Sequence, residues 1–159
     1  MAKAILNGLF DAIKKGDVPV FKMCVQRIGH RLDYLNARNS EGYTALHLSC
    51  LNSHIGFVRW LVDLGVDTEI KSKEECWTAL HCACITSSKQ IVIFLLNSFA
   101  NPFVSDEQGY KPIDVAIKSE IKDILRKHME IDSRKESIVE NKYCDENCRH
   151  EEYCQVTRL

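Results

Sequence analysis

The sequence predicts an all-α protein, built as a stack of antiparallel helix pairs with turns projecting between them. Two observations predict this class. A short segment recurs at residues 39–47, 73–81 and 106–114, so that the copies begin 34 and then 33 residues apart. Apolar residues after the first two copies also correspond and keep helical spacing. Units this small have helices too short to be stable alone, so the fold depends on stacking of neighbouring units.

Each copy predicts a tight turn followed by two helices. Gly42 and Gly109 stand fourth in their segments, where a residue without a Cβ reaches a positive φ without strain. Thr44 and Thr78 come directly before a short apolar run, at the place of a helix N-cap. The helix pairs are expected at residues 45–52 with 56–64, and at residues 79–86 with 89–98. Gly65 is expected to end its helix in the left-handed conformation.

Three hexapeptides in register carry a resemblance to a known family. They are TALHLS at residues 44–49, TALHCA at 78–83 and KPIDVA at 111–116. This pattern resembles the ankyrin repeat, whose signature is a turn followed by T-P-L-H-x-A and two antiparallel helices, here with alanine replacing the usual proline. The resemblance implies an ankyrin-repeat solenoid with projecting β-turn fingers. It also implies that His47 and His81 hydrogen-bond the adjoining turn, in place of a catalytic or metal-binding role.

The repeats are expected to divide the chain into five parts. The parts are a degenerate N-terminal capping repeat at 1–35, full repeats at 36–71 and 72–104, a shortened C-terminal repeat at 105–129, and a charged tail at 130–159. Terminal repeats are often atypical because they cap the stack. Residues 28–35 are interpreted as an insertion or irregular loop. The tail is expected to be disordered or partly helical, with residues 130–140 able to extend the last helix.

Four positions depart from the repeat pattern by replacing a glycine. Cys76 takes the place of the turn glycine and Phe99 the place of the helix-ending glycine, while Ser53 and Ser87 end the inner helices. A residue with a side chain costs on the order of 1 kcal/mol or more at a positive φ. Either these turns change shape, or this part of the stack is less stable than a consensus stack.

Composition excludes several classes of function. A net charge of −1 without a Lys/Arg cluster argues against nucleic-acid binding. No apolar run approaches the roughly 20 residues that span a bilayer, and the N-terminus has no secretory signal, so the cytosol or the nucleus is expected, with the eight cysteines reduced. No phosphate-binding loop, nucleophile motif or paired carboxylates indicate an enzyme or a cofactor.

The tail carries two further hypotheses. Four residues of the types that bind zinc occur with the spacing C-x3-C-x-H-x3-C, namely Cys144, Cys148, His150 and Cys154. Such a Cys₃His set can hold zinc, and the alternatives are a redox site or a tail with reduced thiols. The C-terminus resembles a ligand of PDZ domains, with Thr157 two places before Leu159.

The resemblance places a partner-binding groove along the turns and the ends of the inner helices. The expected binding residues are Ser40, Glu41, Tyr43, Leu51, Asn52, Glu74, Glu75, Trp77, Ile85, Thr86, Glu107, Gln108 and Tyr110, with Lys118 and Ser119 in the shortened repeat. The aromatic residue at the fifth turn position recurs three times and predicts a ladder of rings, flanked by acidic tips. Alternatively, the rings contact neighbouring turns and only stiffen the fingers.

The function expected from this surface is non-catalytic protein binding. The chain is interpreted as a monomeric adaptor or regulatory subunit that binds one partner, with an apolar ridge flanked by Lys or Arg. A sharper alternative is a regulator of a protein kinase in cell-cycle or signalling control, since the plan is similar to the small inhibitors of cyclin-dependent kinases. Further alternatives are an inhibitor of a Rel-type transcription factor and a zinc or redox module in the tail.

Overall fold

The structure is a computed structural model, and it describes residues 2–29 and 31–142 of the chain. Over these residues the chain is all-α, with no strand and a single isolated bridge between Arg38 and Thr44. The helices are α1 (Ala2–Lys15), α2 (Val18–Ile28), α3 (Leu32–Leu35), α4 (Ala45–Leu51), α5 (Ile55–Asp63), α6 (Ala79–Ile85), α7 (Lys89–Asn97), α8 (Pro112–Val115) and α9 (Ser119–Lys142). The predicted fold class is confirmed.

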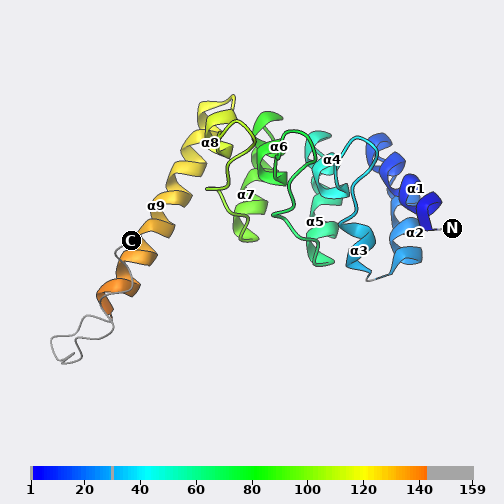
Figure 1. Ribbon diagram of the computed structural model, residues 1–159, viewed down its shortest axis with the longest axis horizontal. Coiled ribbons are helices and arrows are strands. Elements are labelled where there is room, and N and C mark those ends of the chain that lie inside the picture. Colours follow the sequence, from blue (N-terminus) through cyan, green and yellow to red (C-terminus); the bar gives the residue numbers. More distant parts are fainter. Residues whose placement is uncertain (1, 30, 143–159) are drawn as a thin grey trace. The chain divides into compact units, whose positions relative to one another are not determined.

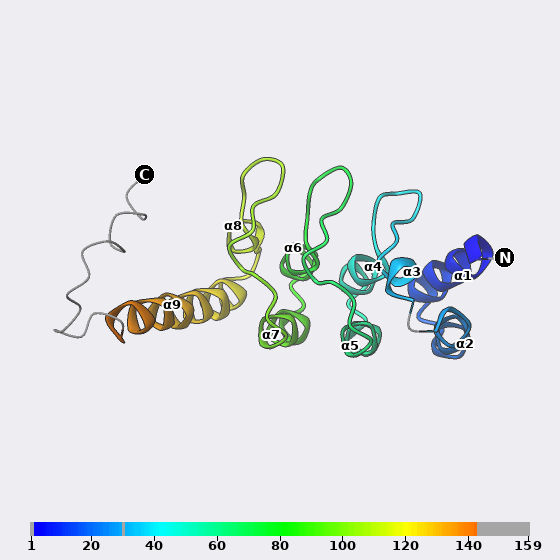
Figure 2. The same ribbon diagram turned by 60° about the horizontal axis from the view of Figure 1, so that its bottom comes forward.

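Apart from the short α3, the helices up to α8 form two rows (Figure 1). The inner row holds α1, α4, α6 and α8, and the outer row holds α2, α5 and α7, with all three long turns projecting on the side of the inner row (Figure 2). The described chain divides into two compact units, of which the first ends at Arg126 and the second begins at Lys127. The first unit contains the stack, so every contact discussed below lies within it.

The predicted helix pairs lie within a residue or two of their expected bounds. The final helix does extend through residues 130–140, because α9 runs from Ser119 to Lys142. Residues 28–35 are more regular than the expected loop, since α3 forms one helical turn at Leu32–Leu35. The inner helix of the last repeat is short, since α8 has only four residues.

Leucine and isoleucine side chains from successive repeats form one continuous core. Leu46 of α4 and Leu80 of α6 are each at most 1 % exposed, and so are Leu61 and Leu95 from the outer row. Full burial of such a side chain contributes about 1.5–3 kcal/mol. The core continues to Leu125 in the first turns of α9. Each repeat is therefore stabilised mainly by its neighbours.

The four glycine replacements keep the turn shape that the family's glycine adopts. Ser53, Cys76, Ser87 and Phe99 all have positive φ, with values of 57°, 56°, 57° and 64°. The turns therefore do not change shape, and the lower stability that was the other expected outcome stays a prediction. Phe99 is also 92 % exposed, so its ring returns little packing energy for the strain.

Candidate functional site

Three hairpin-like fingers form the edge of the inner face. They are named finger 1 (residues 38–44), finger 2 (71–78) and finger 3 (105–111). Each finger is closed at its base by a backbone bond, from the amide of Asn39, Ser72 or Asp106 to the carbonyl of Tyr43, Trp77 or Tyr110, at 2.8, 2.7 and 2.9 Å. We use "inner face" for the side of the stack formed by these fingers together with α1, α4 and α6.

Finger 2 contains one residue more than finger 1. The Asn39 Oδ1 accepts the amide of Tyr43, and the hydroxyl of Ser72 accepts the amide of Trp77 in the same way. The 34-residue spacing paired Asn39 with Lys73, and that pairing is wrong at this point because Ser72 takes the anchoring role. Lys73 instead belongs to the tip, next to the two glutamates that were expected there.

The two motif histidines each hold the finger that follows them. The Nε2 of His47 lies 2.7 Å from the carbonyl oxygen of Trp77, and the Nε2 of His81 lies 3.2 Å from the carbonyl oxygen of Tyr110. A carbonyl can only accept, so Nε2 carries the proton and donates. Nδ1 then accepts from Thr44, whose Oγ1 is 2.7 Å away. Burial lowers the pKa of both imidazoles, which favours this neutral form.

The first two aromatic residues of the expected ladder donate to the next finger. The Tyr43 hydroxyl donates to Glu75 at 3.0 Å, and the Trp77 Nε1 donates to Asp106 at 3.3 Å. Burial, with the hydrogen bond to Glu75, raises the pKa of Tyr43 to about 12. Both rings are half-buried, whereas Tyr110, which has no finger after it, is 55 % exposed. Contacts of this kind agree with the alternative interpretation of the ladder, in which the rings contact neighbouring turns and stiffen the fingers.

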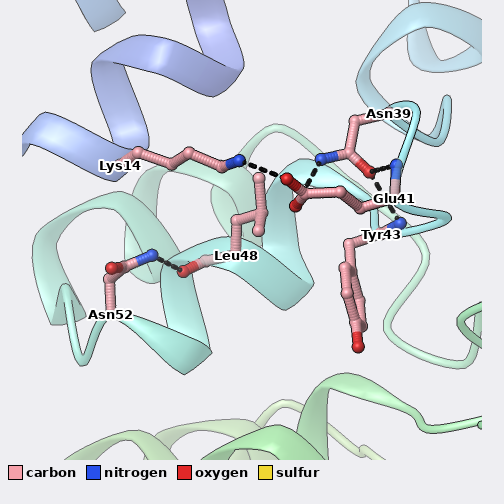
Figure 3. A network of polar contacts seen from close by, with 6 residues as sticks. All are labelled: Lys14, Asn39, Glu41, Tyr43, Leu48 and Asn52. Carbon is pink, nitrogen blue, oxygen red and sulfur yellow. Dashed lines mark hydrogen bonds and ion pairs between the residues drawn. The ribbon is translucent and has the colours of Figure 1, made fainter.

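The acidic tips are not equivalent to one another. Glu41 forms an ion pair with Lys14 of α1 at 2.7 Å and also contacts Asn39 (Figure 3). The hydrogen bond from Lys14 holds the pKa of Glu41 below its usual value. Glu75 is occupied by Tyr43, as described above. Glu74 and Glu107 are exposed, and within the described residues neither carboxylate has a hydrogen-bond or ion-pair partner.

The remaining expected binding residues divide into tips and helix ends. Ser40 and Gln108 are exposed at the finger tips. At the helix ends, the Asn52 amide donates to the carbonyl of Leu48 (Figure 3), and the Thr86 hydroxyl donates to nearby carbonyls, including that of Cys82. Leu51 and Ile85 are half-buried at the equivalent ends of α4 and α6. Lys118, just before α9, and Ser119, its first residue, are exposed. The assignment of all these residues to binding stays a prediction.

Sequence reasoning missed a hollow beside finger 1. It has a volume of about 530 Å³ and lies between α1 and the edge of finger 1. The walls from α1 include Lys3, Leu6, Asn7, Phe10 and Lys14, and those from finger 1 include Arg38, Asn39 and Ser40. The signal was present, because the α1 residues recur at helical spacing along one face. The repeat pattern does not point to it, because the α1 residues belong to no turn and have no counterpart in a finger.

The part of the chain that the structure describes contains no cluster of side chains that could form a metal centre. No group of three or more His, Cys, Asp or Glu side chains lies close enough there to hold an ion. Cys50, Cys82 and Cys84 are fully buried in the core, and burial raises the pKa of each thiol, to about 12 for Cys84. The zinc and PDZ hypotheses concern Cys144, Cys148, His150, Cys154, Thr157 and Leu159, which lie outside the described residues.

Among the described residues, no helix reaches both the length and the hydropathy of a membrane span.

Comparison with known sequences points to one family. A sequence model of ankyrin repeats in many copies matches residues 32–83, and a model of three ankyrin copies matches residues 65–134. Similar proteins include Ankyrin repeat and SAM domain-containing protein 6 of Mus musculus, 28 % identical over 109 residues that make up 69 % of this chain and 12 % of that protein. A palmitoyltransferase of Kluyveromyces lactis is 29 % identical over 116 residues, which are 72 % of this chain and 15 % of the relative.

A third relative is the Inhibitor of Bruton tyrosine kinase of Mus musculus, 30 % identical over 81 residues, or 51 % of this chain and 6 % of that protein. The chain thus spans 15 % or less of the length of each of these three relatives. Ankyrin repeats are in general non-catalytic modules for protein interaction, and the matched models cover the described fingers and their helix pairs. The chain is an ankyrin-repeat protein.

Proposed function

We propose that this chain binds one protein partner through its inner face, as an adaptor or regulatory subunit, and catalyses no reaction itself. The observation that carries the proposal is the division of labour within the fingers. Side chains at the finger bases and along the finger edges hold one finger to the next. The side chains of Ser40, Glu74 and Glu107 at the tips, and that of Tyr110 at the base of finger 3, are exposed and make no contact that holds the fold.

Rigid presentation of these tips favours binding. A loop that must order on binding loses conformational entropy, at a cost of about 0.5–1.5 kcal/mol for each immobilised side chain. In this stack the fingers are fixed beforehand by bonds from His47, His81, Tyr43 and Trp77. A partner therefore meets a preorganised surface. Tyr110 supplies a large exposed ring of the kind that anchors interfaces.

Regulation of a protein kinase is the second candidate. It is supported by the similarity to a relative whose name is Inhibitor of Bruton tyrosine kinase. The similarity covers only the repeats, which are a small share of that protein. We therefore place kinase regulation below the general proposal, and it predicts that the captured partner contains a kinase domain.

A paired set of variants tests the proposal. The full chain is used to capture partners, which are then identified by mass spectrometry. A tip variant with Glu74→Ala, Glu107→Ala and Tyr110→Ala is compared with an outer-row variant carrying Gln90→Ala and Asn97→Ala, which are exposed on α7. Loss of a specific partner with the tip variant alone supports the proposal. Equal capture by wild type and tip variant would overturn it.

Trp77 is less suitable as the first probe. Its indole donates to Asp106, so Trp77→Ala would loosen finger 3 as well as remove a contact surface. Tyr110 has no finger after it, so its truncation leaves the bonds between fingers intact. The helical circular dichroism spectrum of each variant should match that of the wild type, which confirms that the stack is preserved.

A further inference from the structure

Finger 1 has an edge that the other two fingers do not leave open. The amide of Lys73 in finger 2 donates to the carbonyl of Gly42, and the amide of Glu107 in finger 3 donates to the carbonyl of Glu75, each at 3.1 Å. The equivalent group on finger 1 is the amide of Ser40, which has no hydrogen-bond partner among the described residues. The described residues before finger 1 contain no finger that could supply this partner.

The hollow of about 530 Å³ lies against this open edge. Its lining includes two apolar side chains from α1, the half-buried Leu6 and the largely buried Phe10. Its charged lining consists of three cations, Lys3, Lys14 and Arg38, and one anion, Asp11. The hollow therefore offers a backbone donor, a small apolar surface and an excess of positive charge within one space.

The contacts of the cations show which of them are available. Lys14 is paired with Glu41, and Arg38 donates to the carbonyl oxygen of Lys71 at 2.7 Å. Lys3 is exposed and makes no hydrogen bond or ion pair among the described residues. In fingers 2 and 3 an aromatic donor of the preceding finger reaches an acidic side chain, and in finger 1 the donor to Glu41 is Lys14. The hollow is thus built on the pattern of the finger-to-finger interface, with one finger absent.

We propose that this hollow binds an extended acidic segment of the protein partner, which takes the place of the absent finger. The segment would accept the amide of Ser40 with a backbone carbonyl, as Gly42 accepts Lys73. Its carboxylates would face Lys3, and an apolar side chain would contact Leu6 and Phe10. The inference rests on the proposed function, because it names the chemistry of the partner at one end of the same inner face.

This location refines the partner chemistry suggested by the finger tips. Exposed Glu74 and Glu107 favour a basic contact on fingers 2 and 3, while the hollow favours an acidic one beside finger 1. A partner segment whose charge changes sign along its length would satisfy both. Charge complementarity of this kind fixes the direction in which a segment lies on a surface.

A synthetic peptide that alternates leucine and glutamate is the probe for this site, and its counterpart with lysine in place of glutamate is the control. Each is titrated into the nitrogen-labelled full chain while amide correlation spectra are recorded at low ionic strength. We expect the acidic peptide to shift the Ser40 amide and amides along α1, and the basic peptide to leave them unmoved. Absence of these shifts, or an equal response to both peptides, would overturn the proposal.

Three variants sharpen the result. Lys3→Glu should weaken binding of the acidic peptide by about fivefold or more, because it replaces an attractive charge by a repulsive one. Asp11→Asn should strengthen it about twofold, since it removes the one acidic group of the lining. Lys22→Glu makes the same charge change on the outer row and should leave the affinity unchanged. Equal effects of Lys3→Glu and Lys22→Glu would contradict the assignment to the hollow.

The two proposals fail separately. If the tip variant loses its partner but Lys3→Glu leaves both peptide binding and partner capture unchanged, the hollow is not the acidic site and the proposed function stands. If the Ser40 amide shifts with protein concentration in the absence of peptide, a second copy of the chain occupies the hollow, and the proposal is overturned. Shifts that follow the acidic peptide and respond to Lys3→Glu support it, whichever natural partner is captured.

Discussion

The imidazole of His47 donates from Nε2 to the main-chain oxygen of Trp77 over 2.7 Å, and so ties α4 to the base of finger 2. The same ring accepts from Thr44 at the beginning of its own helix. One side chain therefore fixes the start of a helix and the position of the next finger at once. His47 is 1 % exposed, so both bonds are shielded from water in the intact fold.

We expect His47→Ala to lower the free energy of unfolding by about 2–3 kcal/mol, because it removes one of the two donors to the Trp77 carbonyl, takes the acceptor away from the buried Thr44 hydroxyl and leaves a cavity. His81→Ala is the matched comparison. Its bond to Tyr110 is longer, at 3.2 Å, and holds the last finger, so we expect the smaller loss there. Urea unfolding followed by circular dichroism measures both. A larger loss for His81→Ala would contradict this ranking.

Stability should fall as the pH is lowered from 7 towards 5. Burial depresses the pKa of both His47 and His81 below the ordinary value of 6.5, so the unfolded chain binds more protons than the folded chain in this range. The stabilisation is complete above pH 6.5 and is lost as the pH falls towards the folded pKa values. Each histidine contributes a slope of at most about 1.4 kcal/mol per pH unit.

Urea midpoints measured between pH 7 and pH 5.5 test this dependence. His47→Ala should flatten the curve, because one of the two proton-linked groups is removed. The carboxylates with lowered pKa, Glu41 and Glu120, lose their stabilising effect only as the pH falls through and below their ordinary value of 4.5. An unchanged slope in the variant would show that the imidazole of His47 does not control the acid response.

Phe99→Gly should stabilise the stack although it removes a large apolar side chain. Phe99 holds a φ of 64° and its ring is 92 % exposed, so little packing is lost while the backbone strain is relieved. A gain of about 0.5–1 kcal/mol is expected, after the entropy that glycine adds to the unfolded chain. Phe99→Ala removes the ring and keeps the strain, so we expect no gain from it. Equal unfolding midpoints for the two variants would refute the strain argument.

Gly42→Ala should be clearly more harmful than Gly109→Ala. The φ values are close, at 83° and 88°, so the cost of a Cβ at positive φ is similar, about 1 kcal/mol. A Cβ at Gly42 would lie 2.5 Å from the Cβ of Lys73, whereas nothing lies within 4 Å of one at Gly109. The clash should add about 1–3 kcal/mol at Gly42 alone. Thermal unfolding of the pair measures the difference directly.

The sequence predicted the features that depend on contacts close along the chain or repeated at a fixed spacing. Thr44 and His47 occupy a recognisable motif, and the bond to the next finger follows from the family resemblance. The positive φ at Cys76 and Phe99 followed from the glycine that each replaces, although the sequence could not decide between a strained residue and an altered turn.

What the sequence did not reveal depends on contacts without a repeat. The extra residue of finger 2 could not be seen in the sequence. The hydroxyl of Ser72 accepts the same backbone bond as the Oδ1 of Asn39, but serine and asparagine are not similar enough to be aligned on that ground. The pairing of Lys14 with Glu41 joins an irregular first repeat to a regular second one. The roles of Glu41 and Glu75 therefore differ, although both occur as acidic residues in a finger.

The bonds between fingers have a mechanical consequence. Each finger is held by the one before it, through Tyr43 and Glu75 and then Trp77 and Asp106, and no bond of this kind skips a repeat. Under a force applied to the two ends of the domain, the repeats should separate one after another, each adding a similar length of about 33 residues of released chain. We expect separation to begin at the last repeat, because its inner helix α8 has only four residues.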